Sequence, residues 1–277
     1  MSASARASSR RRLAFVRRHL LTAYAMLAFA YLLLPIAVVI AFSFNDPPGK
    51  FNYTWEGFTL DNWRNWDAVP GLRDAIVLSI QIAVIASLAA TALGTLIALA
   101  IVRHRYRGRG VTNLLVFLPM ATPEIVLGAS LLSLFLTASG VFTLGPWTIL
   151  IAHAMFCISY VVVTAKARLI GFDRHLEEAA MDLGANELVT FARVTLPLLA
   201  PAILSGFLLS FALSVDDFVI TNFVAGDEIT FPVFVWGAAR VGAPPQVNVI
   251  GSMIFLAAVA VMAVNALVQI RRSKGAQ

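Results

Sequence analysis

Six long stretches of the sequence are almost entirely apolar, and this pattern restricts the fold more than any other feature. They run over about residues 20–43, 74–102, 111–137, 146–165, 198–220 and 247–270. A helix needs about 20 mostly apolar residues to cross the hydrocarbon core of a bilayer. Each stretch meets this requirement. The sequence therefore predicts an all-α, polytopic membrane protein with six transmembrane helices.

The composition supports a membrane protein and disfavours other classes. Hydrophobic residues make up 59% of the chain and charged residues 13%, against about 45–50% and about 25% in an average soluble domain. A soluble protein this apolar has too few polar groups for its surface, and a disordered chain is less hydrophobic. The single cysteine, Cys157, rules out an intrachain disulfide, and the histidines show no metal-ligand spacing.

The first apolar stretch follows an arginine-rich start, as a secretory signal would. Its apolar run is longer than the 7–15 residues typical of a signal, and no small-residue cleavage site closes it. We therefore expect it to be retained as the first transmembrane helix. The chain then divides into a basic N-terminus at 1–19, a single transmembrane domain at 20–270 and a tail at 271–277.

The positive charges predict the orientation of the helices. Most of the 21 lysines and arginines lie in the N-terminus, the 103–110 loop, the 166–197 segment and the tail. Positive residues remain on the cytoplasmic side of a membrane, so both termini are expected in the cytoplasm. The net charge of +6 thus reports topology. Nucleic-acid binding is disfavoured because no basic patch accompanies a recognisable fold for it.

The cytoplasmic segment 173–197 is too elaborate for a simple connector. Asp173 is suited to cap a helix, and Gly184 can end that helix in a left-handed turn. Asn186 can cap a second short helix, which would run until Pro197 starts the next span. We therefore predict a helix–glycine–helix elbow that projects into the cytoplasm.

The elbow carries features of a docking surface. Small Ala179 and Ala180 would let a partner approach closely, and three acidic residues would present charge to it: Glu177, Glu178 and Asp182. A monomeric membrane protein has little use for such an exposed projection. The function indicated by the residues themselves is therefore contact with another protein.

The elbow resembles the EAA signature of permease subunits of ATP-binding-cassette (ABC) importers. The signature reads Glu-Ala-Ala, three residues, Gly, nine residues, an aliphatic residue, one residue and Leu-Pro. It is matched here by Glu178, Ala179, Ala180, Gly184, Val194, Leu196 and Pro197. The resemblance implies the type I importer permease fold, in which the elbow is the coupling helix that inserts into a groove of the ATPase subunit. It adds Gly184 and Pro197 to the expected coupling residues.

Other segments resemble the polyamine permeases of the spermidine/putrescine type. They are GFTLDNW (57–63), LPMATPEIVLG (118–128), LSVDDFVITNFVAG (213–226) and RVGAPPQVN (240–248). The resemblance implies a bacterial inner-membrane subunit that works by alternating access. It also implies a second homologous permease, two copies of an ATPase and a periplasmic substrate-binding protein as partners.

The chain lacks the phosphate-binding loop of an ATPase. The pattern G-x-x-x-x-G-K-[ST] occurs nowhere in the sequence. We therefore expect a non-catalytic subunit without a cofactor of its own, powered by a separate ATPase that binds ATP and Mg²⁺.

Three carboxylates fall within the predicted spans: Glu124, Asp216 and Asp217. Charged groups inside the membrane are costly and are therefore functional candidates. No lysine or arginine in the same segments would neutralise them, whereas a protonated polyamine would. Pro119 and Pro123 are expected to break the helix around Glu124, which suits backbone lining a cavity.

Aromatic side chains could complete a substrate path or gate through cation–π contact. The candidates are Trp55, Phe218, Phe223 and Trp236. Structural roles are the alternatives at several of these positions. Asp216 and Asp217 would cap a helix end, Glu124 would pair with the partner permease, and the tryptophans of the 44–73 loop would form an interfacial belt.

Two other functions compete with polyamine import. The same machine could carry another amine, an amino-acid derivative or ferric ion. Alternatively, the chain could be a self-sufficient secondary transporter or channel. Inverted-repeat halves would favour the latter, and the sequence shows none.

Overall fold

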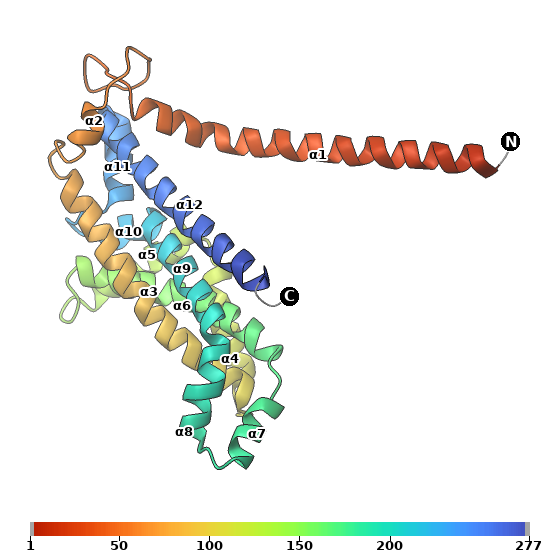
Figure 1. Cartoon of the computed structure of the whole chain (residues 1–277). Coiled ribbons are helices and arrows are strands. Elements are labelled where there is room, and N and C mark those ends of the chain that lie inside the picture. The colour runs from red at the N-terminus through yellow and green to blue at the C-terminus, as the bar shows by residue number, and fades with distance from the viewer. Residues whose placement is uncertain (1–2, 275–277) are drawn as a thin grey trace. The chain divides into compact units, whose positions relative to one another are not determined.

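The computed structural model describes the backbone of residues 3–274 and the side chains of residues 19–263. Within that range the chain is helical, and its β structure is limited to one isolated bridge between Asn45 and Phe58. The basic side chains of the predicted N-terminus up to residue 18, and those of the tail, lie outside the described residues. Figure 1 labels the helices. Their bounds are α1 (Ala3–Phe42), α2 (Asp61–Arg64), α3 (Leu72–Arg103), α4 (Arg109–Ala121), α5 (Glu124–Thr137), α6 (Pro146–Ile170), α7 (His175–Asp182), α8 (Glu187–Thr190), the π-helix η1 (Phe191–Thr195), α9 (Leu196–Asp216), α10 (Val219–Val224), α11 (Phe231–Val241) and α12 (Pro245–Lys274).

Five of the six predicted spans correspond to single helices that are long and apolar enough to cross a membrane: α1, α3, α6, α9 and α12. The sixth candidate is the bent pair α4 and α5, which together cover the stretch predicted at 111–137. The all-α prediction with six spans is therefore confirmed when the bent pair counts as one span.

The third span is not a continuous helix, as the proline positions predict. Helix α4 ends at Ala121, α5 begins at Glu124, and their axes differ by 109°. Pro123 disfavours the helical conformation in the preceding residue, and Thr122 is extended, with φ −81° and ψ 134°. Pro119, by contrast, is accommodated inside α4. The interruption of the helix therefore lies immediately before Glu124.

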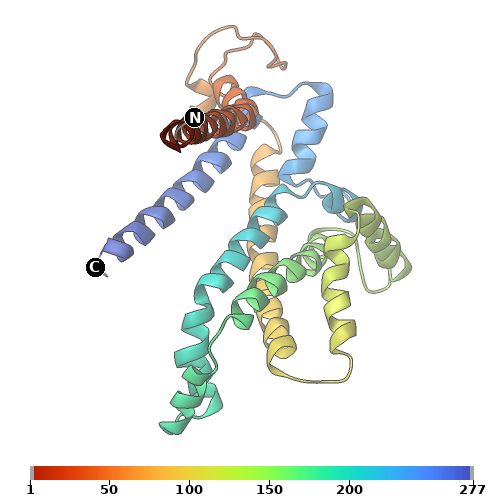
Figure 2. The same ribbon diagram turned by 90° about the vertical axis from the view of Figure 1, so that its right-hand side faces the viewer.

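The chain forms two compact units, residues 71–237 and residues 1–70 with 238–277. In the first unit, α3, α6 and α9 pack together, and α6 is the most enclosed of the three, with 56% of its most apolar stretch buried. In Figure 2, α3 and α9 lie next to each other, and α7 and α8 lie beyond the N-terminal end of α9. Ala86 and Ala90 of α3 are fully buried, and a Cβ at Gly94 would lie 2.8 Å from Cβ of Val161. Small residues thus bring α3 close to α6.

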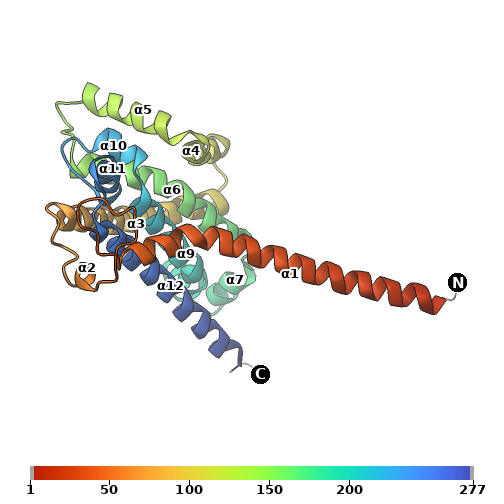
Figure 3. The ribbon, with the colours of Figure 1, turned by 90° about the horizontal axis from the view of Figure 1, so that it is seen from above.

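In the second unit, α1 and α12 are in contact and come together at the ends next to the 43–60 loop (Figure 3). Three asparagines fix this loop. The Asn45 amide donates to Asn52 Oδ1 at 2.7 Å, and the Asn62 amide donates to Asn45 O at 2.7 Å. The loop presents Trp55, which is 51% exposed and packs edge-on against Phe42. Within residues 19–42 of α1 no side chain is buried, so this part of the helix remains available to lipid or to another protein.

Candidate functional site

The elbow predicted at 173–197 has the expected turn and second helix. Helix α7 ends in a Schellman motif, in which Gly184 adopts φ +88° and Gly184 N–H donates to Met181 O at 2.9 Å. Ala185 N–H closes the same motif on Ala180 O at 3.1 Å. Asn186 caps α8 by accepting from Val189 N–H at 2.9 Å. The left-handed glycine and the Asn186 cap are thus confirmed.

The elbow is joined to the fifth span without interruption. From Glu187, the chain passes through α8 and the π-helix η1 into α9, and forms one helical segment of 30 residues that ends at Asp216. Pro197 follows directly after η1, at the beginning of α9, and does not interrupt this segment. A displacement of the elbow would therefore act directly on the span that carries Asp216.

The elbow presents apolar as well as acidic side chains. Leu183 is 90% exposed and Leu188 is 79% exposed. Glu178, Ala179 and Asp182 are also exposed, and Ala180 is half-buried. Sequence reasoning missed both leucines. For Leu183, the available signal was an apolar residue directly before a helix-ending glycine in a polar segment between two spans.

One imidazole borders this surface. His175 Nδ1 lies 3.1 Å from Glu178 Oε2. The hydrogen bond to that carboxylate raises the pKa of His175 above its usual value. This contact adds a local positive charge beside Glu178 when the imidazole is protonated.

Glu177 does not belong to the exposed surface, contrary to the expectation that it would present charge to a partner. Its side chain is only 16% exposed and forms a salt bridge with Arg103 at the end of α3. The physical reason is its position in α7. It faces back toward α3 and η1, whereas Glu178, one residue later, faces outward.

Asp216 and Asp217 have different environments. Asp216 is the last residue of α9 and is exposed, and its carboxylate forms no hydrogen bond or ion pair with the described residues. The Asp217 side chain is 6% exposed and caps α10 by accepting from Thr221 N–H at 2.8 Å and Thr221 Oγ1–H at 2.9 Å. The capping role considered from the sequence thus describes the geometry of Asp217, whereas the Asp216 carboxylate is open.

His153 connects Asp217 to the neighbouring helices. Its Nε2 lies 3.1 Å from Asp217 Oδ2 and 2.8 Å from Thr221 Oγ1, and its Nδ1 lies 2.7 Å from Ser214 Oγ. The imidazole is 3% exposed. It therefore ties α6 to the interruption between α9 and α10. The sequence did not indicate this contact between His153 and Asp217, which lie 64 positions apart.

The aromatic candidates divide into separate groups. Phe218 and Trp236 lie together, with ring centroids 5.1 Å apart and planes tilted by 38°. Phe223 instead packs on α5, where a Cβ at Gly128 would lie 2.6 Å from its ring. Glu124 is exposed at the first residue of α5. Phe218 and Trp236 are thus the pair that the structure brings together near the end of α9.

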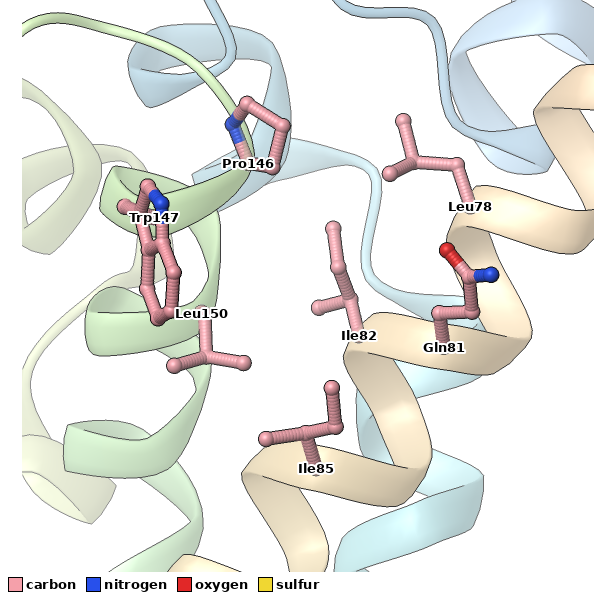
Figure 4. A pocket seen from close by; sticks show the side chains of 7 residues that line it. All are labelled: Leu78, Gln81, Ile82, Ile85, Pro146, Trp147 and Leu150. Carbon is pink, nitrogen blue, oxygen red and sulfur yellow. The ribbon is translucent and has the colours of Figure 1, made fainter.

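A cavity of about 120 Å³ lies between α3 and α6 and was not predicted. Figure 4 shows its lining: Leu78, Gln81, Ile82, Ile85, Pro146, Trp147 and Leu150. These side chains are apolar apart from the Gln81 amide and the Trp147 ring nitrogen. With no carboxylate in its lining, the cavity does not match a ligand that carries several positive charges.

Comparison with known proteins gives a consistent picture. Residues 90–272 match the family model "Binding-protein-dependent transport system inner membrane component". The chain is 36% identical over 253 residues to the spermidine/putrescine transport system permease protein PotC of Haemophilus influenzae. This alignment covers 91% of this chain and 97% of the relative. It is 37% identical over 235 residues to the putrescine transport system permease protein PotI of Escherichia coli, and this alignment covers 83% of each chain.

A solved structure has the same fold. The crystal structure of a bacterial ABC transporter involved in the import of the acidic polysaccharide alginate aligns with a TM-score of 0.64. The alignment covers 94% of this chain and 96% of the other, at 20% sequence identity. The similarity confirms the ABC importer permease fold, and the low identity carries no information on the cargo.

Proposed function

The chain belongs to the inner-membrane components of binding-protein-dependent transport systems, and from that premise we propose that it is a permease subunit of an ATP-driven polyamine importer. The cargo proposal is supported by 36–37% identity to spermidine/putrescine and putrescine permease proteins over most of the chain. Putrescine and spermidine are the proposed substrates. The proposed location is the bacterial inner membrane, with both termini in the cytoplasm.

The proposed complex contains this chain, a second homologous permease, two copies of an ABC ATPase and a periplasmic substrate-binding protein. The elbow is the surface for the ATPase. Its exposed Leu183 and Leu188 would enter an apolar groove, while Glu178 and Asp182 would meet polar groups at the rim. ATP and Mg²⁺ belong to the ATPase subunits, so this chain supplies movement and a path but no catalysis.

The single observation that carries the mechanism is the uninterrupted helical segment from Glu187 to Asp216. At 1.5 Å per residue it is about 45 Å long, more than the hydrocarbon thickness. Closure of the ATPase dimer would displace the elbow, and a continuous helix would carry that displacement to Asp216. Alternating access follows if this movement opens the substrate path outward and ATP hydrolysis reverses it.

The proposed substrate path uses the open carboxylates Glu124 and Asp216 to bind ammonium groups. Asp216 lies at the C-terminal end of α9, where the helix dipole disfavours negative charge, so a bound cation would relieve that cost. Phe218 and Trp236 offer aromatic faces for cation–π contact. In this proposal Asp217 acts as the gate element at the break between α9 and α10. Phe223 and Trp55 are further aromatic candidates for substrate contact.

Uptake by intact cells tests this function. Deletion of this chain from its host should abolish ATP-dependent uptake of labelled putrescine or spermidine, and re-expression should restore it. ATP depletion should stop uptake in the restored strain, whereas a proton uncoupler that leaves ATP intact should not. Uptake that instead follows the ion gradient would favour a secondary transporter. Polyamine uptake unaffected by the deletion, with loss of another solute, would change the cargo.

A further inference from the structure

The side chain of Glu177 joins three elements at the cytoplasmic end of the 71–237 unit. Its Oε1 accepts from Arg103 Nη2 and from Thr195 Oγ1, each at 2.5 Å. Arg103 is the last residue of α3, Glu177 lies in α7 and Thr195 is the last residue of η1. One carboxylate oxygen therefore connects α7 both to the end of α3 and to η1, which leads into the fifth span.

All three residues are largely, though not completely, shielded from water. The side chains of Arg103 and Glu177 are each 16% exposed, and Thr195 is 3% exposed. Charge-assisted hydrogen bonds are stronger than neutral ones, and low exposure reduces their screening. A pair on an exposed surface would contribute little. Because these side chains have low exposure, we expect their contact to stabilise the position of α7 against α3 and η1.

Neighbouring contacts also connect the end of α3 to the residues that precede α7. The Arg103 guanidinium carbon lies 5.2 Å from the centre of the Phe172 ring, which precedes α7. Arg174 donates to Val102 O at 3.3 Å, a second connection between the elbow and the end of α3. Beneath them, α3, α6 and α9 share a buried apolar cluster that includes Ile101, Leu169 and Leu199.

We propose that Glu177 is the positioning residue of the elbow, which clamps α7 to α3 and to the start of the fifth span. This inference rests on the proposed coupling function. Helix α7 has only eight residues, too few to hold its own geometry. With the clamp closed, an ATPase that moves the elbow moves α3 and α9 together. With the clamp open, α7 moves alone and part of the displacement is lost.

The clamp is distinct from the docking surface and from the EAA signature. The signature glutamate is Glu178, whose side chain is 60% exposed, whereas Glu177 is held inside the chain. The two neighbouring carboxylates therefore have different roles in this proposal. Glu178 faces the partner, and Glu177 faces the transmembrane helices.

Hydrogen exchange of the purified full-length chain tests the clamp without any ATPase. In Glu177→Gln, the neutral amide weakens both hydrogen bonds, and the amides of 177–183 should exchange about fivefold faster. Thr195→Val removes one donor with little change in shape and should give a smaller increase. Glu187→Gln, which removes an exposed carboxylate from α8, should leave these exchange rates unchanged. Equal rates in wild type and Glu177→Gln would overturn the clamp.

The reconstituted complex supplies the functional readout. Glu177→Gln should still bind the ATPase, but polyamine transported per ATP hydrolysed should fall by a similar, about fivefold, factor. The charge swap Arg103→Glu with Glu177→Arg should recover part of the loss, because it restores the ion pair. An unchanged transport-to-ATP ratio in Glu177→Gln would overturn the positioning role. A wild-type complex that ignores polyamines would overturn the proposed cargo, while the exchange result would still decide the clamp.

Discussion

Replacing Leu183 with aspartate should release the ATPase from this chain while leaving the chain folded. Leu183 is 90% exposed, so the substitution removes almost no packing within the chain, and exposed sites tolerate changes within about 0.5 kcal/mol. Burying a leucine side chain in a partner's groove stabilises contact by about 1.5–3 kcal/mol, and an unpaired carboxylate there adds a further cost. We therefore expect affinity to fall by about 100-fold.

The measurement is co-purification of the ATPase with the tagged chain, followed by titration of the ATPase onto chain reconstituted in nanodiscs. Val141→Asp is a matched control, because Val141 is 80% exposed but lies in the α5–α6 loop, on the opposite side of the membrane in the proposed topology. This control should retain the ATPase. Normal ATPase affinity in Leu183→Asp would contradict the assignment of the elbow as the ATPase contact.

Replacing Asp216 with asparagine should raise the polyamine concentration needed for half-maximal transport by about tenfold or more. A hydrogen-bonded contact to a charged group contributes about 1.5–3 kcal/mol, which corresponds to that factor. Folding should not suffer, because removing a negative charge from the C-terminal end of α9 is favourable by up to about 1 kcal/mol. Transport by the complex, measured across a range of putrescine and spermidine concentrations, gives the value.

Two variants place this result in context. Asp227→Asn removes another exposed carboxylate, in the segment between α10 and α11, and should leave the half-maximal concentration unchanged. Asp217→Asn retains an acceptor for the α10 cap but removes the charge that faces His153. It should lower the maximal rate, as expected for a gate. An unchanged half-maximal concentration in Asp216→Asn would remove Asp216 from the substrate path.

Features encoded by neighbouring residues could be predicted from the sequence. Span positions follow from the length of apolar runs, and the elbow follows from Gly184 and Asn186, whose turn and cap involve residues within about four positions. The break before Glu124 follows from the restriction that Pro123 places on Thr122. Its angle of 109° did not follow, because tertiary packing determines the direction after a break.

Features that depend on distant residues could not be predicted. Arg103 and Glu177 are 74 positions apart, so the sequence offered no reason to turn Glu177 inward while Glu178 stayed exposed. The contact between His153 and Asp217 likewise joins α6 to the residue after α9. Charge type alone placed both aspartates in the substrate path, and the structure distinguishes the open Asp216 from the capping Asp217.

The most direct test of the central claim is ATPase activity in nanodiscs. The chain would be purified with its native neighbours and assayed with binding protein that is empty or loaded with putrescine or spermidine. A polyamine importer should contain a co-purifying ATPase, and its activity should rise with polyamine-loaded binding protein and stay low with the empty one. A complex without an ATPase, or one whose activity ignores every polyamine, would contradict the proposed function.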